Sequence, residues 1–279
     1  MKSNQEIKDT VMQKYSEIAL QEKSVNLSSC CGAGGCSSEV YNIMSDAYDK
    51  LEGYNPEADL GLGCGLPTEF ALIEKGNVVL DLGSGAGNDA FVARSLTGPE
   101  GKVIGVDFTD AMINKARQNL EKLGYHNVEF RAGDIEDLPV NASSIDVIVS
   151  NCVLNLVPDK KKAFSEMFRV MKEGGHFSIS DIVLKGTLPE GLQSAAEMYA
   201  GCVAGAILKS EYLKMLEETG FKNIKIQKEK AIIVPVDILE QYLNVEDLKA
   251  YLDNKEIIFS ITVYGEKASQ ACCSDSCCS

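Results

Sequence analysis

The chain has 279 residues, enough for one large α/β domain with additions and a full hydrophobic core. Its 27 Lys and Arg residues against 41 Asp and Glu residues give a formal charge of −14. This balance disfavours nucleic acid and anionic membrane surfaces as partners, because both need clustered basic side chains. The N-terminal sequence MKSNQEIKDT lacks the apolar core of a signal peptide, and no segment approaches the roughly 18 apolar residues of a membrane span. We therefore expect a cytoplasmic protein.

The N-terminal part of the chain is expected to be an extension of the core, covering residues 1–70. Residues 6–23 carry apolar side chains at helical spacing and predict an amphipathic helix. Residues 26–38 form a Ser/Gly/Cys loop, and residues 40–51 predict a second helix. The sequence LGLGCGLP at residues 60–67 then leads toward the core.

The sequence VVLDLGSGAG, which begins at Val78, predicts a short buried strand followed by a turn with little side-chain bulk. Asp81 closes the strand, and the turn contains Gly83, Ser84, Gly85 and Gly87. Asn88 then begins the apolar-periodic run NDAFVARSL, which predicts a helix. Backbone N–H groups and the positive end of a helix dipole therefore meet at this turn, where a ligand can approach closely.

Three further strands end at residues suited to ligand contact. The strand KVIGVD ends at Asp107, about twenty residues after the turn, where an acceptor for ribose hydroxyls is expected. VEFRAGDIEDLP starts at Val128 and places Asp134 and Ile135 at its carboxyl end, and IDVIVSN ends at Asn151. Ligands of open parallel sheets bind outside the carboxyl ends of the strands, so we expect all four ends to line one crevice. A helix at residues 160–171 and a fifth strand at residues 176–181 follow.

This pattern resembles the class I S-adenosylmethionine-dependent methyltransferases, with an acid before the glycine turn, an acid after the second strand and a Gly-Asp pair after the third. The resemblance implies a Rossmann-like α/β sheet with helices on both faces, an N-terminal helical extension and C-terminal additions. The cofactor contacts that it implies are Asp81, Gly83, Ser84 and Gly85 for the methionine part, Asp107 and Phe108 for ribose and adenine, Asp134 and Ile135 for the adenine edge, and Asn151 for a backbone contact near the methionine. An NAD-binding domain is the alternative, but an acid at the mouth of the turn suits an ammonium group better than a pyrophosphate.

The core is expected over residues 71–190 and C-terminal additions over residues 191–267. Residues 192–218 are expected to be largely helical, and residues 224–234 and 257–264 to form an antiparallel edge. A helical insertion, VDILEQYLNVEDLKAYL, lies between these two strands. Residues 268–279 form a flexible, Cys-rich tail whose CCSDSCC sequence is either a thiol clamp for substrate or a dispensable disordered segment.

Ten cysteines without an export signal favour free thiols, metal binding or catalysis over disulfides. No pair has CxxC spacing, and only His126 and His176 could complete a mixed zinc site, so structural zinc is a minor alternative. Cys152 directly follows the fourth strand and is predicted to face the substrate side of the crevice, although a lone buried cysteine is often a small hydrophobe. Cys202 lies in YAGCVAGAI, whose small residues allow close approach of a ligand or of another backbone.

The motifs LGLGCGLP, LDLGSGAGND, IGVDFTDAMINKA, SNCVLNLVPDK, ISDI and GCVAGA resemble those of the arsenite methyltransferases over residues 60–221. The resemblance implies that Cys152 and Cys202 bind trivalent arsenic. It places a third thiol upstream of the core, where Cys36 is the first choice, Cys31 the second, and Cys30 is also present. Cys64, within GCGLP, is expected to pack rather than to bind arsenic. The implied reactants are S-adenosylmethionine, arsenite or methylarsenite, and a thiol reductant such as glutathione or thioredoxin.

The chemistry agrees with the residue types. Trivalent arsenic is soft and favours thiolates, and its lone pair can attack a methyl group without losing a proton, so the site needs no general base. No histidine lies at a predicted strand end. Two other functions remain open: methylation of another small molecule such as a quinone, or sequestration of arsenic or a metal by a thiol-rich protein. The acids at three strand ends argue against sequestration, because a protein that only binds arsenic or a metal through thiols does not need donor-binding acids at these positions.

Overall fold

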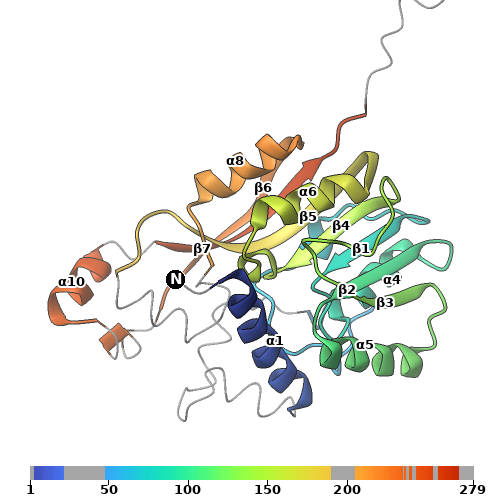
Figure 1. Cartoon of the computed structure of the whole chain (residues 1–279), viewed down its shortest axis with the longest axis horizontal. Coiled ribbons are helices and arrows are strands. Elements are labelled where there is room, and N and C mark those ends of the chain that lie inside the picture. The colour runs from blue at the N-terminus through green and yellow to red at the C-terminus, as the bar shows by residue number, and fades with distance from the viewer. Residues whose placement is uncertain are drawn as a thin grey trace, which may run out of the picture.

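The computed structural model describes residues 3–21, 48–189, 205–234, 236, 239–240, 243–253 and 257–269. Within these ranges a seven-stranded sheet, in the order β3-β2-β1-β4-β5-β7-β6, carries helices on both faces (Figure 1). The predicted Rossmann-like α/β architecture is therefore confirmed. Of the predicted helix at residues 40–51, residues 40–47 lie outside the described residues, and residues 48–51 form a turn rather than a helix. Of the predicted helical stretch at residues 192–218, residues 192–204 lie outside the described residues, and residues 209–218 are helical.

Five strands run parallel at the centre and on one side of the sheet. They are β1 (Val78–Leu82), β2 (Lys102–Asp107), β3 (Val128–Ala132), β4 (Ile145–Asn151) and β5 (Met171–Leu184). The pairs β1–β2, β1–β4, β2–β3 and β4–β5 are all parallel. Their carboxyl ends therefore meet at one edge of the sheet, as the sequence predicts.

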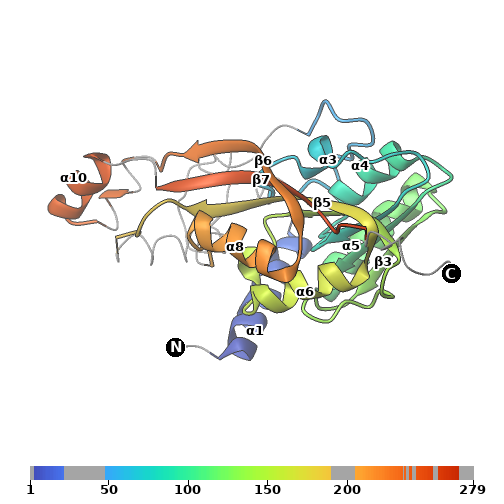
Figure 2. The same cartoon turned by 90° about the horizontal axis from the view of Figure 1, so that it is seen from above.

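The last two strands extend the sheet in the antiparallel sense. β7 (Ile258–Glu266) pairs with β5, and β6 (Lys222–Ile232) pairs with β7. β5 has 14 residues, so the predicted strand at residues 176–181 was too short. The reason is tertiary: β7 pairs with β5 as far as Leu184, and β4 pairs with β5 from Met171. Figure 2 shows these three strands running side by side and reaching toward α10.

Alternating side chains of the central strands form separate cores on the two faces of the sheet. On one face, Val79 packs with Phe91 of α4 (Asn88–Thr97) and Met112 of α5 (Asp110–Leu123). These side chains are fully buried. This core therefore fixes α4 and α5 directly behind the loops that follow β1 and β2.

The opposite face is covered by α6 (Lys160–Val170) and α8 (Lys209–Thr219). Leu80 of β1, one residue after Val79, packs into this second core together with Phe164 of α6 and Tyr212 of α8. The rings of Phe164 and Tyr212 meet edge to face, with centroids 5.4 Å apart. The change of face between successive residues is the period-2 pattern of a strand buried on both sides.

The predicted N-terminal helix is confirmed as α1 (Asn4–Leu20). It begins with a capping box, in which Ser3 accepts from the backbone N–H of Glu6 while the Glu6 carboxylate accepts from the backbone N–H of Ser3. At its other end Ala19 is buried in the core formed with α5, and Lys115 of α5 donates to the Ala19 carbonyl at 3.0 Å. α1 is thus docked on α5 by an apolar contact and a C-terminal cap.

Three shorter elements are also described: α3 (Pro67–Phe70), the 3-10 helix η2 (Leu154–Leu156) and α10 (Val245–Asp253). α10 lies within the predicted helical insertion and buries Tyr251 against the ends of β5 and β7. Among the described residues, no helix combines the length and apolar character needed to cross a lipid bilayer.

Candidate functional site

A cavity of about 1100 Å³, its open mouth included, lies where the carboxyl ends of β1, β2 and β4 meet. Side chains from the loop after β3 and from α1 also line it. The lining includes every residue for which the sequence implies a cofactor contact: Asp81, Gly83, Ser84, Gly85, Asp107, Phe108, Asp134, Ile135 and Asn151. The structure therefore brings these residues together, while their individual contacts with a cofactor stay predictions.

The glycine turn is shaped by tight packing on one side and open space on the other. Gly83, Gly85 and Gly87 have φ angles of 64°, 50° and 100°, in the left-handed region that favours glycine. A Cβ on Gly83 would lie 2.4 Å from the Val153 side chain, whereas a Cβ on Gly85 would meet only the Met112 sulfur, at 4.0 Å. The open side faces the cavity, so a ligand there can approach the backbone closely.

Asp107 is held in a fixed orientation at the end of β2. One carboxylate oxygen accepts from the backbone N–H of Gly85 at 3.0 Å, and the other accepts from the backbone N–H of Thr109 at 2.8 Å. Its burial raises its pKa, and the two backbone N–H groups oppose that effect. Asp107 thus ties the glycine turn to the start of α5 while lining the cavity.

Asp81 lines the cavity and has an unpaired carboxylate oxygen. Its side chain is buried, and Oδ2 has no hydrogen-bond partner among the described residues. Burial, and then the charges of Asp89 and Asp107, raise the pKa of Asp81 well above its ordinary value. A bound cation would supply the missing partner and relieve the repulsion, which is what the ammonium group of S-adenosylmethionine offers. Other cavity-lining atoms buried without a described partner are Ser84 Oγ and Asn88 Oδ1.

A buried network that sequence reasoning missed lies beside Asp81. Tyr48 donates its hydroxyl to Asp89 at 2.9 Å, and the Asn151 amide nitrogen donates to Asp89 at 3.2 Å and to the Gly65 carbonyl at 2.9 Å. Burial raises the pKa of Asp89 to about 6, although hydrogen bonds from Tyr48 and Asn151 lower it. The sequence offered one signal for this network, which is the position of Asp89, an acid in the first turn of the helix that follows the glycine turn.

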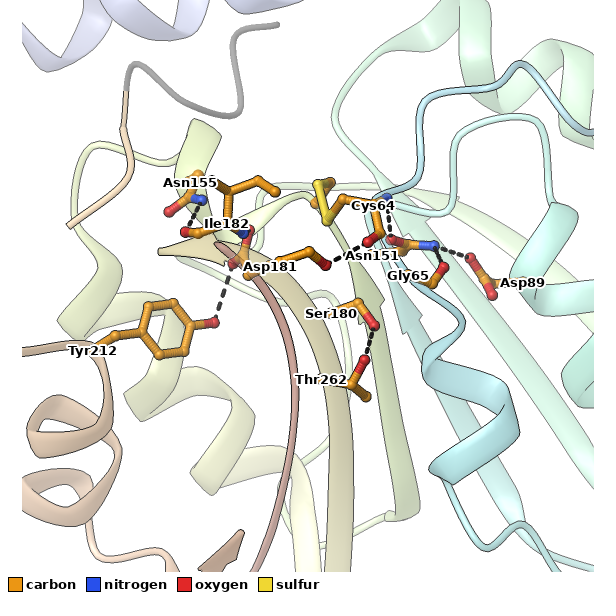
Figure 3. Close-up of a disulfide and its surroundings, with 12 residues drawn as sticks. Cys64, Gly65, Asp89, Asn151, Asn155, Ser180, Asp181, Ile182, Tyr212 and Thr262 are labelled. Atoms are coloured by element: carbon orange, nitrogen blue, oxygen red, sulfur yellow. Dashed lines mark hydrogen bonds between the residues drawn. A yellow bond between two sulfur atoms is a disulfide. The ribbon is translucent and has the colours of Figure 1, made fainter. Parts of the chain in front are cut away.

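Cys152 lines the same cavity and is joined to Cys64 by a disulfide (Figure 3). Their Cα atoms are 5.9 Å apart, and both residues are almost fully buried. The preference for free thiols over disulfides was therefore wrong for this pair. Cys64 does pack in an apolar cluster, as expected, but its sulfur also bonds to the cysteine predicted to bind arsenic.

The segment around Cys64 is held tightly across the ends of β4, β5 and β7. The Cys64 N–H donates to Asn151 Oδ1 at 3.0 Å, and Ser260 donates its hydroxyl to the Cys64 carbonyl. A Cβ on Gly63 would lie 2.6 Å from Asn151 Nδ2, and one on Gly65 would lie 2.5 Å from Ser180 Oγ. The glycines of the GCG sequence thus allow the close approach that places Cys64 beside Cys152.

The other cysteines with predicted roles, Cys31, Cys36 and Cys202, lie outside the described residues, as do Cys30 and the C-terminal tail. Gly205, three residues after Cys202, is described. A Cβ there would lie 1.8 Å from the Asn155 carbonyl oxygen, so the small residue at this position permits close contact with another backbone.

Neither histidine belongs to the cavity. His126 is exposed. His176 lies in the middle of β5, and its Nε2 atom is 2.7 Å from the Ala71 carbonyl oxygen. In the part of the chain that the structure describes, no three His, Cys, Asp or Glu side chains gather as a metal site.

The fold and the cavity define a class I S-adenosylmethionine-dependent methyltransferase. A family model described as "Methyltransferase domain" matches residues 73–220. The arsenite methyltransferase of Halobacterium salinarum is 38% identical over 95% of this chain and 68% of its own length. The crystal structure of CrArsM, an arsenic(III) S-adenosylmethionine methyltransferase from Chlamydomonas reinhardtii, superimposes with a TM-score of 0.62 and 33% identity, covering 82% of this chain and 73% of that one. The chain belongs to the arsenite methyltransferase family.

A more limited similarity links the chain to methyltransferases with another substrate. The demethylmenaquinone methyltransferase of Lactococcus lactis is 33% identical, over 49% of this chain and 54% of its own length. The similarity to the Halobacterium salinarum protein covers almost twice as much of the chain, which favours the arsenite methyltransferases as its relatives.

Proposed function

We propose that this protein transfers methyl groups from S-adenosylmethionine to trivalent arsenic bound by Cys152, Cys202 and one N-terminal cysteine, Cys36 or Cys31. The observation that carries the proposal is the position of Cys152, a soft sulfur ligand in the wall of the cavity that carries the predicted donor-binding residues. Arsenite and methylarsenite are the substrates proposed.

In this proposal the donor is bound by the residues at the strand ends. Asp81, with its unpaired oxygen, receives the ammonium group of the methionine part, next to Gly83, Ser84 and Gly85. Asp107 and Phe108 contact ribose and adenine. Asp134 and Ile135 contact the adenine edge, and Asn151 lies near the methionine part. This distribution is supported by the buried carboxylates, which favour a cationic ligand over a pyrophosphate.

S-adenosylmethionine, when bound, supplies an electrophilic methyl group. The protein's part is to place the arsenic lone pair in line with that group and to exclude water. Arsenic held by sulfur has no proton to lose, so a general base is not required. The absence of a histidine from the described cavity lining agrees with this requirement.

A thiol reductant is part of the proposed reaction. Cys152 cannot offer a thiolate to arsenic while it is bonded to Cys64. Opening this disulfide takes two electrons and two protons, which two thiols such as glutathione, or one dithiol such as thioredoxin, provide while they become a disulfide. Such reductants are abundant in the cytoplasm, which supports the proposed location there.

The experiment that tests the proposal compares acceptors under identical conditions. Purified protein is incubated with S-adenosylmethionine and a thiol reductant, with either arsenite or a demethylated naphthoquinol, and the products are separated and identified. We expect methylated arsenic and S-adenosylhomocysteine in matching amounts with arsenite. Methylation of the naphthoquinol alone would favour the quinone alternative, and tight arsenite binding with no S-adenosylhomocysteine would favour sequestration.

A further inference from the structure

We propose that Lys8 on α1 is a positioning residue of the donor site, which orients the acidic loop after β3 and fastens α1 across the cavity mouth. The donor would then enter and leave when this contact opens. The proposal rests on the cavity being the S-adenosylmethionine site, and it does not depend on the identity of the methyl acceptor.

Lys8 makes two ion pairs with the loop after β3. Its Nζ atom lies 2.6 Å from Asp134 Oδ2 and 2.6 Å from Glu136 Oε2. The exposed fractions of the three side chains are 23% for Lys8, 38% for Asp134 and 7% for Glu136. The contact to Glu136 is therefore well shielded from solvent, unlike a typical surface ion pair.

The loop has a second set of hydrogen bonds that connects it to the rest of the site. The backbone N–H of Glu136 donates to Asp134 Oδ1 at 2.9 Å, and the backbone N–H of Asp159 donates to Glu136 Oε1 at 2.9 Å. Lys8 thus completes a frame in which both oxygens of each carboxylate have a donor. Asp134, predicted to contact the adenine edge, is held in one orientation by this frame.

The charges of Lys8, Asp134 and Glu136 favour a stable contact between α1 and the loop after β3. Burial alone lowers the pKa of Lys8, but its hydrogen bonds to Asp134 and Glu136 raise the pKa above its ordinary value. Lys8 therefore stays a cation across the physiological range. Without it, two neighbouring carboxylates would face each other on one short loop, and the buried Glu136 would lose its counter-ion.

α1 is anchored at both ends and lies along the cavity between them. Near its start Lys8 pairs with the loop after β3, and near its end Ala19 packs on α5 and receives the Lys115 hydrogen bond. Between these anchors Tyr15 lines the cavity, as Lys8 itself does. Figure 1 shows α1 lying beside α5. If the Lys8 end opens, water can solvate the charges that it separates, whereas opening the Ala19 end would expose an apolar contact to water.

The test compares three variants of the full-length protein. Lys8→Met keeps much of the aliphatic stem and removes the charge, and Lys8→Arg keeps the charge. Lys14→Met removes a lysine from the same helix for which the described residues show no ion pair. S-adenosylhomocysteine is the probe, and its affinity is measured by calorimetry without arsenite. Hydrogen exchange of the α1 amides is measured with and without the probe.

For Lys8→Met we expect S-adenosylhomocysteine affinity to fall about 10-fold, because the variant loses two charged hydrogen bonds that are only partly exposed to solvent. The α1 amides should exchange faster, and the probe should protect them less. The KM for S-adenosylmethionine should rise with little change in kcat. Lys8→Arg should restore most of the affinity, and Lys14→Met should behave as the wild type.

Two results would overturn the proposal. The first is equal affinity and equal α1 exchange in Lys8→Met and Lys14→Met, which would show that the ion pairs do not hold the helix. The second is a parallel loss of kcat, affinity and thermal midpoint in Lys8→Met, which would indicate a merely structural role. Because the probe assays contain no arsenite, failure of the proposed arsenic chemistry would leave their outcome unchanged.

Discussion

Reduction of the Cys64–Cys152 disulfide should lower the free energy of unfolding by an amount that follows from the chain separation. The two cysteines are 88 residues apart in the sequence. In the chain-entropy model, a closed loop of this length is worth about 4–5 kcal/mol at 25 °C, because it restricts the unfolded chain. The two residues are almost completely buried, and as free thiols they would still pack as small hydrophobes. The loss on reduction should therefore arise mainly in the unfolded state.

Urea unfolding followed by far-UV circular dichroism, before and after treatment with a phosphine, measures this difference. The chain has no tryptophan, so circular dichroism is preferable to intrinsic fluorescence. We expect the wild type to lose about 4 kcal/mol on reduction. The matched control is Cys64→Ser, which cannot form this disulfide. Any loss of stability that Cys64→Ser shows on phosphine treatment must therefore come from the other cysteines. If the wild type and Cys64→Ser respond equally to the phosphine, the disulfide contributes nothing and the reasoning fails.

Three further predictions concern the donor site, the second core and the arsenic ligands. Asp107→Ala should weaken S-adenosylhomocysteine binding by about 10- to 100-fold in calorimetry, because a charged acceptor is lost; unchanged affinity would contradict its role. Burial raises the pKa of Asp181 to about 7, above its value in the unfolded chain, so the folded state binds the extra proton and wild-type stability falls as pH rises from about 4 to 7. In Asp181→Asn the side chain still accepts from Tyr212 but does not titrate, so this variant should lack the decline in stability, which is at most about 4 kcal/mol in the wild type. Urea titrations at several pH values measure the difference, and parallel stability profiles of the two proteins would refute the prediction. Replacing the true third ligand, tested singly as Cys36→Ser, Cys31→Ser and Cys30→Ser, should abolish turnover of arsenite while activity on methylarsenite is retained, and equal losses on both substrates would contradict this.

The parallel core could be predicted because its signals are local. The strands at residues 102–107 and 145–151 have the predicted bounds, since each is a hydrophobic run that ends at a polar residue. The length of β5 could not be predicted in this way. Its last residues are strand because β7 pairs with them, and β7 comes from a distant part of the chain.

The same distinction holds for the site. The glycine turn and the acids at the strand ends each lie in a short motif next to a predicted parallel strand, so their meeting at one cavity followed from the parallel topology. The Cys64–Cys152 bond joins residues far apart in the sequence, and no local pattern announces it. The side chain of Asn151 was also missed as a hub: it accepts from the Cys64 N–H and donates to Asp89, contacts that only the folded chain creates.

The most direct test of the central claim is a pair of measurements on Cys152→Ser. The variant removes one sulfur from the cavity wall and leaves the donor-binding residues in place. Because a hydroxyl is a poor ligand for a soft centre, arsenite methylation should be lost while S-adenosylhomocysteine affinity stays within about twofold of the reduced wild type. Wild-type turnover of arsenite by Cys152→Ser would show that Cys152 is not the arsenic ligand and would contradict the account.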